Sequence, residues 1–243
     1  WGGTFIAGRV LALALPAAVG SLLRYVVAVA ALLLATRWLE GGLPRLTRRQ
    51  VAGTLLLGAT GIFAYNLFFL GALARLPASR TSLIIALNPV VTIAAASLFM
   101  GERLSPRRWL GVAVALAGVW IVVSRGDVFG SVAGAVGLGE LLMFGGVCSW
   151  AAYTLIGRRV LAGLSPLAAT TWAALWGTAL LALAAAPDLA ALRREDLTAP
   201  VVLSVLYLGV LGTSVAFVWY YQAVQRLGAS RTVIFNNLVP VFG

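Results

Sequence analysis

The sequence predicts an all-α membrane protein built from two inverted repeats of five helices. Three observations predict this class. Hydrophobic residues make up 61% of the 243 residues and charged residues only 10%, whereas a soluble domain carries about 25% charged residues. Apolar runs such as Trp109–Val123 approach the length of about 20 residues that crosses a bilayer. Finally, the segment Gly71–Val91 recurs at Gln222–Phe242, with roughly half of its positions identical.

Each span is expected to be a helix, because lipid offers the backbone no hydrogen-bond partner and the sequence lacks the alternating pattern of strands. Short connections that carry most of the Arg residues separate one apolar stretch from the next. The expected spans, in chain order, are Trp1–Leu15, Ala17–Leu39, Val51–Ala74, Thr81–Met100, Trp109–Ser124, Leu138–Ile156, Pro166–Ala186, Ala199–Val224 and Ser230–Gly243.

The two copies define the domain boundaries, since Trp1 in the first copy corresponds to Trp150 in the second. The predicted units are a first repeat over residues 1–125, a Gly-rich connecting loop over 126–137 and a second repeat over 138–243. Alignment of the copies predicts that the first helix is partial, the ninth truncated and the tenth missing here, so that the intact protein has ten helices.

A repeat with an odd number of crossings inserts its second copy upside down. The Arg residues between the spans then fall into groups of eleven on one side and six on the other. Because Arg accumulates on the cytoplasmic side of membrane proteins, the side with eleven is expected to face the cytoplasm. The other side carries Arg80 and Glu140, and Glu140 is expected to interact favourably with the dipole of the helix that begins beside it.

Charge and composition exclude several classes. All 18 basic residues are Arg and the net charge is +11, but their location between spans indicates membrane orientation and no nucleic-acid partner. Cys148 is the single cysteine and the chain has no His, so no metal or other cofactor is expected. No Asp or Glu lies in mid-span. Proton coupling would therefore need Glu102 or Glu140 at the span ends or residues in the missing helices, and facilitative or exchange transport is favoured.

Two Asn–Pro pairs occupy related places in the two copies. Asn88 precedes Pro89, and Asn236 and Asn237 precede Pro240. A proline frees a carbonyl of the preceding turn and permits a bend, so two helix bends with amide groups beside them are expected near the bilayer midplane. This arrangement indicates a solute-binding site at the repeat interface. The alternative is that Asn bonds to neighbouring backbone and proline only shapes the packing.

Aromatic and polar residues inside the spans extend this candidate solute-binding site. The third span offers Tyr65 and Asn66, and the eighth offers Trp219 and Tyr220. Polar groups at this depth are costly unless they face a cavity or a partner.

Two tryptophans related by the repeat, Trp1 and Trp150, lie inside their spans, and Tyr153 shares a helical face with Trp150. These three are expected to line a cavity for flat or apolar solutes, the alternative for a membrane Trp being interfacial anchoring. Arg24 lies several residues inside the second span. Snorkelling to the near interface is the simpler interpretation, and pairing with a solute carboxylate or with backbone carbonyls is the alternative.

Several short motifs resemble the drug/metabolite transporter superfamily, in particular its EamA-like branch. They are WGGTF at Trp1–Phe5, Leu23–Tyr25, Ala78–Pro89, Gly101–Leu104 and Ser149–Ala151. The resemblance covers nearly the whole chain in two copies. It implies a ten-helix carrier of the bacterial inner membrane with both termini cytoplasmic, and many such carriers export amino acids, metabolites or drugs. It implies fold and transport and leaves the substrate open.

The predicted function is secondary transport of small organic solutes across the lipid bilayer by alternating access. A non-transporting membrane scaffold is the alternative, although a scaffold would not need paired Asn–Pro bends. An intramembrane enzyme would need a nucleophile–base pair, paired acids or a metal cluster. None is visible, so the protein is not expected to be an enzyme. The sequence sets no oligomeric state.

Overall fold

The computed structural model describes residues 1–101, 106–123 and 136–242. The predicted connecting loop over 126–137 lies almost wholly outside these residues, as does Glu102. The described elements are α1 (Gly2–Ala14), α2 (Ala17–Leu39), α3 (Arg48–Leu57), η1 (Gly58–Ala64), α4 (Tyr65–Leu73), α5 (Ala78–Ile84), η2 (Ile85–Leu87), α6 (Asn88–Met100), α7 (Pro106–Val123), α9 (Leu138–Val160), α10 (Pro166–Leu189), η3 (Arg194–Asp196), α11 (Ala199–Gly209), η4 (Val210–Val215), α12 (Ala216–Leu227), α13 (Ala229–Thr232), η5 (Val233–Leu238) and α14 (Val239–Phe242).

The helices confirm the predicted class of an all-α multi-pass membrane protein. Within the described residues, six continuous helical runs are long and apolar enough to cross a bilayer. They are Ala17–Leu39, Arg48–Leu73, Ala78–Phe99, Leu138–Val160, Pro166–Leu189 and Ala199–Leu227. Large apolar side chains such as Leu34, Leu98 and Leu203 are exposed on the outside of the bundle. An apolar exterior of this extent suits contact with lipid.

Local sequence explains where several helices begin. Thr47 and Gln50 form a reciprocal capping box at the start of α3, which satisfies two backbone donors that have no partner inside the helix. At the start of α10, the Ser165 hydroxyl accepts from the Ala168 amide at 3.0 Å, with Pro166 in the first turn. Proline is favoured there because its missing N–H would be unpaired in any case.

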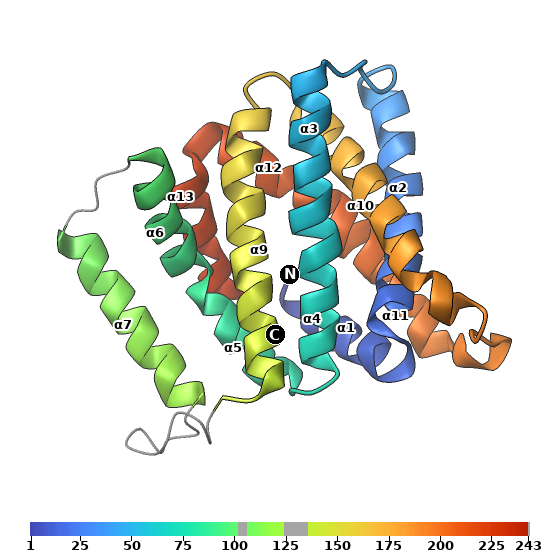
Figure 1. Ribbon diagram of the computed structural model, residues 1–243, viewed down its shortest axis with the longest axis horizontal. Coiled ribbons are helices and arrows are strands. Elements are labelled where there is room, and N and C mark those ends of the chain that lie inside the picture. Colours follow the sequence, from blue (N-terminus) through green and yellow to red (C-terminus); the bar gives the residue numbers. More distant parts are fainter. Residues whose placement is uncertain (102–105, 124–135, 243) are drawn as a thin grey trace.

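The two halves run in opposite directions, as Figure 1 shows. The helical run from α3 to α4 descends from the upper edge of the view, whereas its repeat counterpart from α11 to α12 rises from the lower edge. The run from α5 to α6 rises, and its counterpart α13 lies in the upper part of the view and leads downward. Helices of the two halves also alternate in space, since α2 packs along α10 and α4 along α9.

Both halves contain a π-helical segment at the same place in the repeat. These segments are η1, over Gly58–Ala64, and η4, over Val210–Val215. Each π segment adds about one residue to the turn, so side chains beyond it are rotated by about 100° relative to an unbroken α-helix.

Gly58, the first residue of η1, and Gly209, directly before η4, allow the halves to approach closely. A Cβ added at Gly58 would lie 2.8 Å from the Ala173 carbonyl of α10, and one added at Gly209 would lie 2.7 Å from the Arg24 carbonyl of α2. The two contacts are related by the repeat. They bring α2 and α10 against the middle of the opposite half, where the cavity described below lies.

Helix geometry also changes just before each proline that the sequence analysis singled out. The 3₁₀ segment η2 ends at Leu87, directly before Asn88 and Pro89, and η5 ends at Leu238, two residues before Pro240. A 3₁₀ turn inside a helix changes the direction of the side chains that follow. The Asn side chains therefore lie at breaks in regular α-helix in both halves.

Candidate functional site

A narrow cavity lies where the two halves meet. Its volume is about 30 Å³, which holds about two water molecules. The first half contributes Trp1, Arg24, Tyr65 and Asn88 to its lining. The second half contributes Trp150, Phe217, Asn236 and the backbone of Gly212. Five of the ten residues that the sequence analysis proposed for solute binding therefore line one cavity: Trp1, Tyr65, Asn88, Trp150 and Asn236.

Aromatic residues make up six of the thirteen that line the cavity, with Trp150 at the centre of their ring contacts. Its ring centroid lies 5.3 Å from that of Trp1, 5.2 Å from that of Tyr65 and 5.2 Å from that of Phe217. The Trp1 and Phe217 rings meet it nearly edge to face, the arrangement that aromatic quadrupoles prefer. The wall therefore offers flat apolar surface contributed by both halves.

The two repeat-related tryptophans differ in hydrogen bonding. The Trp1 indole N–H donates to the carbonyl of Gly212 at 2.9 Å, in the π segment η4, where the wider turn leaves carbonyls available. The indole nitrogen of Trp150 is buried and makes no hydrogen bond within the described part of the chain. One polar group of the wall therefore has no hydrogen-bond partner among the described residues.

Asn88 and Asn236 bring amide groups to the cavity from repeat-related helices. They are 1% and 5% exposed, respectively. The alignment of the copies pairs Asn88 with Val239 and Asn236 with Ile85, and all four residues line the cavity. Each half therefore supplies one amide and one aliphatic side chain. The position that carries the amide in one half carries the aliphatic side chain in the other. The side-chain amide oxygen of Asn88, Oδ1, is buried with no hydrogen-bond partner in residues that the structure describes.

Arg24 also lines the cavity, and the preferred interpretation of snorkelling was wrong. The residue is 4% exposed. Its Nη2 donates to the Thr213 hydroxyl of the second half at 2.7 Å, and its guanidinium lies 5.2 Å from the centroid of the Tyr25 ring. The guanidinium reaches inward because residues of α11 and η4 pack over α2. The depth of Arg24 inside its expected span is the sequence signal for this buried position, although it was interpreted as snorkelling.

Asn66 and Tyr153 are buried behind the lining. The Asn66 amide nitrogen donates to the Ile62 carbonyl at 2.6 Å and to the Tyr25 hydroxyl at 3.2 Å, so Asn66 bonds to its own helix as the alternative interpretation proposed. The Tyr153 ring stacks on that of Tyr221 with the centroids 4.8 Å apart, and it covers Gly61. Both side chains support the cavity wall from outside.

Tyr220, Trp219 and Asn237 are not part of the central lining, although the Tyr220 ring packs behind it, with its centroid 5.1 Å from that of Trp150. Tyr220 is buried, with its hydroxyl 2.7 Å from that of Thr154, and it lines a separate apolar groove of about 440 Å³ together with Trp219. Trp219 and Asn237 are exposed. Trp1, Asn236 and Val239 line both spaces, so the groove and the cavity are neighbours.

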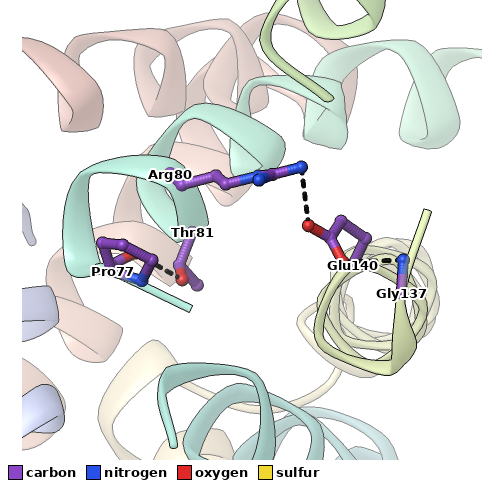
Figure 2. A network of polar contacts seen from close by, with 5 residues as sticks. All are labelled: Pro77, Arg80, Thr81, Gly137 and Glu140. Atoms are coloured by element: carbon purple, nitrogen blue, oxygen red, sulfur yellow. Dashed lines mark hydrogen bonds and ion pairs between the residues drawn. The ribbon is translucent and has the colours of Figure 1, made fainter. Parts of the chain in front are cut away.

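An ion pair joins the first turns of α5 and α9, two helices that both begin on the lower side of the bundle in Figure 1. Arg80 of α5 and Glu140 of α9 approach to 2.8 Å, with 14% and 8% of their side chains exposed. Figure 2 shows that Glu140 also accepts from the Gly137 amide, at 3.0 Å, and so caps its own helix. The Thr81 hydroxyl donates to the Pro77 carbonyl at 2.9 Å, within the first turn of α5. The dipole interaction expected for Glu140 fits this cap, whereas the partnership with Arg80 was not predicted.

Fold and site together define a multi-pass membrane protein with two inverted halves and a cavity between them. The sequence profile of the EamA-like transporter family matches residues 1–124 and 137–243. The chain belongs to this family, which confirms the resemblance noted in the sequence.

Named relatives and a solved structure are consistent with the family. A probable terminal-alkyne amino-acid exporter of Streptantibioticus cattleyicolor is 32% identical over 222 residues, covering 90% of this chain and 71% of the relative. An uncharacterised transporter of Bacillus subtilis, YyaM, is 28% identical over 219 residues, covering 90% and 72%. One protein crystal structure superposes with a TM-score of 0.69 at 23% identity, covering 98% of this chain and 83% of that one. This last similarity concerns the fold alone.

Proposed function

We propose that the protein is a secondary transporter that exports small organic solutes, such as amino acids, metabolites or drugs, across the bacterial inner membrane by alternating access. The observation that carries the proposal is the cavity shared by the two inverted halves, because both supply its aromatic and amide side chains. In carriers built from inverted repeats, the solute site lies at such an interface near the bilayer midplane.

The lining chemistry supports an organic solute. Indole and phenyl rings offer apolar surface, while the Asn88 and Asn236 amides offer donors and acceptors that fix orientation. At about 30 Å³ the cavity holds no such solute in this conformation. Binding therefore requires the halves to separate, which is the motion that alternating access supplies.

The ion pair between Arg80 and Glu140 supports a gate on one side of the cavity. It links helices of different halves, so rocking of one half against the other on that side breaks or forms it. In our proposal this side faces the cell exterior, because fewer Arg residues lie between the spans there. In our proposal, the pair holds the outer gate closed and opens when solute leaves the cell.

A relative supports the choice of solutes, since the similar Streptantibioticus protein is named a probable exporter of an amino acid. The direction of transport that we propose, export, is taken from the name of this relative. The scaffold alternative gains no support from a cavity lined by the Asn88 side-chain amide, whose oxygen is buried without a partner within the described residues.

The decisive experiment is flux through the full-length protein in proteoliposomes. Radiolabelled amino acids and aromatic compounds are presented with and without a pH gradient, and protein-free liposomes serve as the control. We expect saturable uptake of at least one compound and acceleration of that uptake by the same compound on the opposite side. Rates equal to those of protein-free liposomes for the whole panel would overturn the proposal.

A further inference from the structure

We propose that the central cavity binds solutes that carry a carboxylate and that Arg24 is the residue that binds it. The inference deepens the proposed transport function, on which it rests for the role of the cavity, by naming the chemical class of the solute. It begins from a buried positive charge for which the described residues supply no counter-ion.

Arg24 is 4% exposed, and no Asp or Glu among the described residues forms an ion pair with it. The ion pairs seen in that part of the chain join Arg80 to Glu140 and Arg193 to Glu195. A charge removed from water without an opposite charge is strongly unfavourable. One hydroxyl and one aromatic face replace only part of its hydration. An anion that enters the cavity would supply the missing charge.

The donors of Arg24 are incompletely used. A guanidinium has five N–H groups in a planar fork, and the structure records one hydrogen bond from its side chain, to Thr213. The Nε atom is buried without a partner within the described residues. A planar fork with open donors matches the two oxygens of a carboxylate, which is the preferred partner of Arg in bidentate pairs.

Helix packing does not explain the arginine. The Arg24 carbonyl lies beside Gly209, and in the other half the Ala173 carbonyl lies beside Gly58 in the same way. Ala173 is thus the repeat counterpart of Arg24, and an alanine is sufficient for the close approach of helices at this point. The second half folds without a charge at this position, so the guanidinium of the first half is not needed for folding of the repeat.

The rest of the lining fits the remainder of such a solute. Asn88 lines the same cavity, and its side-chain amide oxygen has no partner among the described residues. This oxygen can accept a hydrogen bond from an ammonium or hydroxyl group. The faces of Trp150 and Tyr65 suit an apolar side chain and also attract a cation. An amphipathic amino acid, with its carboxylate on Arg24, satisfies all three kinds of group.

The test compares ligands that differ only at the carboxylate. The full-length protein is purified in detergent, and binding is measured by the ligand-induced rise in unfolding temperature and by competition with tritiated ligand. The pairs are L-phenylalanine with L-phenylalaninamide, L-leucine with L-leucinamide, and 3-phenylpropionate with 3-phenylpropionamide. We expect at least one acid to bind at least tenfold more tightly than its amide. Equal affinities in all three pairs, or binding by none of the acids, would overturn the inference.

Variants then assign the effect to Arg24. R24Q is expected to remove the preference for acids, and R24K to retain it at about tenfold lower affinity, because Lys keeps the charge and loses the fork. R37Q is the matched control, since Arg37 lies on the same helix and is exposed. A preference for acids that persists in folded R24Q protein contradicts the assignment. The comparison of acids with amides in the wild type stands even if R24Q fails to fold.

Binding and flux separate the two proposals. Selective binding of acids without flux in proteoliposomes would support the carboxylate site and contradict transport. Flux of amides at the rates of their acids would support transport and contradict the carboxylate site.

Discussion

The guanidinium of Arg24 in the first half donates to the hydroxyl of Thr213 in the second half at 2.7 Å. The two residues lie on α2 and on the π segment η4, and both are buried. The hydrogen bond therefore connects the inverted halves beside the central cavity.

Thr213→Val removes this bond and keeps the shape of the side chain. We expect the free energy of unfolding in detergent to fall by about 2 kcal/mol, because a hydrogen bond to a buried charged donor contributes about 1.5–3 kcal/mol. Thr178→Val is the control, since the Thr178 hydroxyl bonds only within its own helix, to Ala174. Equal losses in the two variants would contradict a special role for the contact between halves.

Substitutions of the two neighbouring asparagines of η5 test which of the residues proposed from the sequence belong to the site in the structure. Asn236→Ala should lower the transport rate about tenfold, because Asn236 lines the cavity. Asn237→Ala should leave the rate near that of the wild type, because Asn237 is exposed. Initial rates in proteoliposomes, at matched protein density, provide the comparison. A slower N237A with a normal N236A would contradict the assignment of Asn236 to the site.

Trp150 provides a test of the aromatic wall. Trp150→Phe keeps an apolar ring, but the smaller ring makes less contact with Trp1, Tyr65 and Phe217. We expect membrane insertion to be normal and the affinity for aromatic solutes to fall about tenfold, as contacts worth about 0.5–1.5 kcal/mol each are lost. Trp38→Phe is the control, because Trp38 is 80% exposed at the end of α2. The wall assignment fails if both substitutions change the affinity equally.

The ion pair of Figure 2 allows the gate to be tested without unfolding α9. Glu140→Gln removes the negative charge, yet a Gln side chain can still accept from the Gly137 amide and preserve the cap. We expect a cysteine placed at Ile85, in a background where Cys148 is serine, to react several-fold faster with a membrane-impermeant maleimide added outside. Arg80→Gln should act in the same way.

The control for the gate is a second ion pair, between Arg193 and Glu195, whose side chains are 72% and 65% exposed. Exposed pairs of this kind contribute about 0–1 kcal/mol. Arg193→Gln should therefore leave the labelling rate unchanged. A gate role for Arg80 and Glu140 is excluded if their variants label no faster than R193Q.

Gly58 tests the close contact between halves. A Cβ at this position would lie 2.7 Å from the backbone nitrogen of Gly177, which cannot move aside as a flexible side chain can. We expect Gly58→Ala to lower the free energy of unfolding by about 1–3 kcal/mol or more. Gly118→Ala, where nothing lies within 4 Å, should be neutral or slightly stabilising. Thermal unfolding of both purified variants provides the measurement.

The sequence was sufficient for the fold class because apolar length and duplication follow directly from the residues. The same information located the prolines and the repeat-related Trp1 and Trp150. It could not decide which side of a helix faces the cavity. The π segments η1 and η4 and the 3₁₀ segments η2 and η5 each shift the helical rotation, and no pattern in an almost uniformly apolar sequence announces them.

Particular residues show the effect of these shifts. The sequence analysis proposed both Asn236 and Asn237 because both precede Pro240, yet one is buried at the cavity and the other is exposed. Arg24 was judged by the distance to the interface alone, whereas its orientation depends on Thr213, 189 residues later in the chain. Contacts between distant segments therefore determined the parts of the site that the sequence did not predict.

The exchange of amide and aliphatic side chains between the halves has a consequence for any molecule held between them. The pair Asn88 and Val239 and the pair Ile85 and Asn236 give a symmetrical scaffold an asymmetrical lining, and Arg24 without a charged counterpart at Ala173 increases the difference. A bound solute in the reversed orientation would place its polar group against Ile85 or Val239. We therefore expect a solute bound in this cavity to prefer one of its two end-to-end orientations.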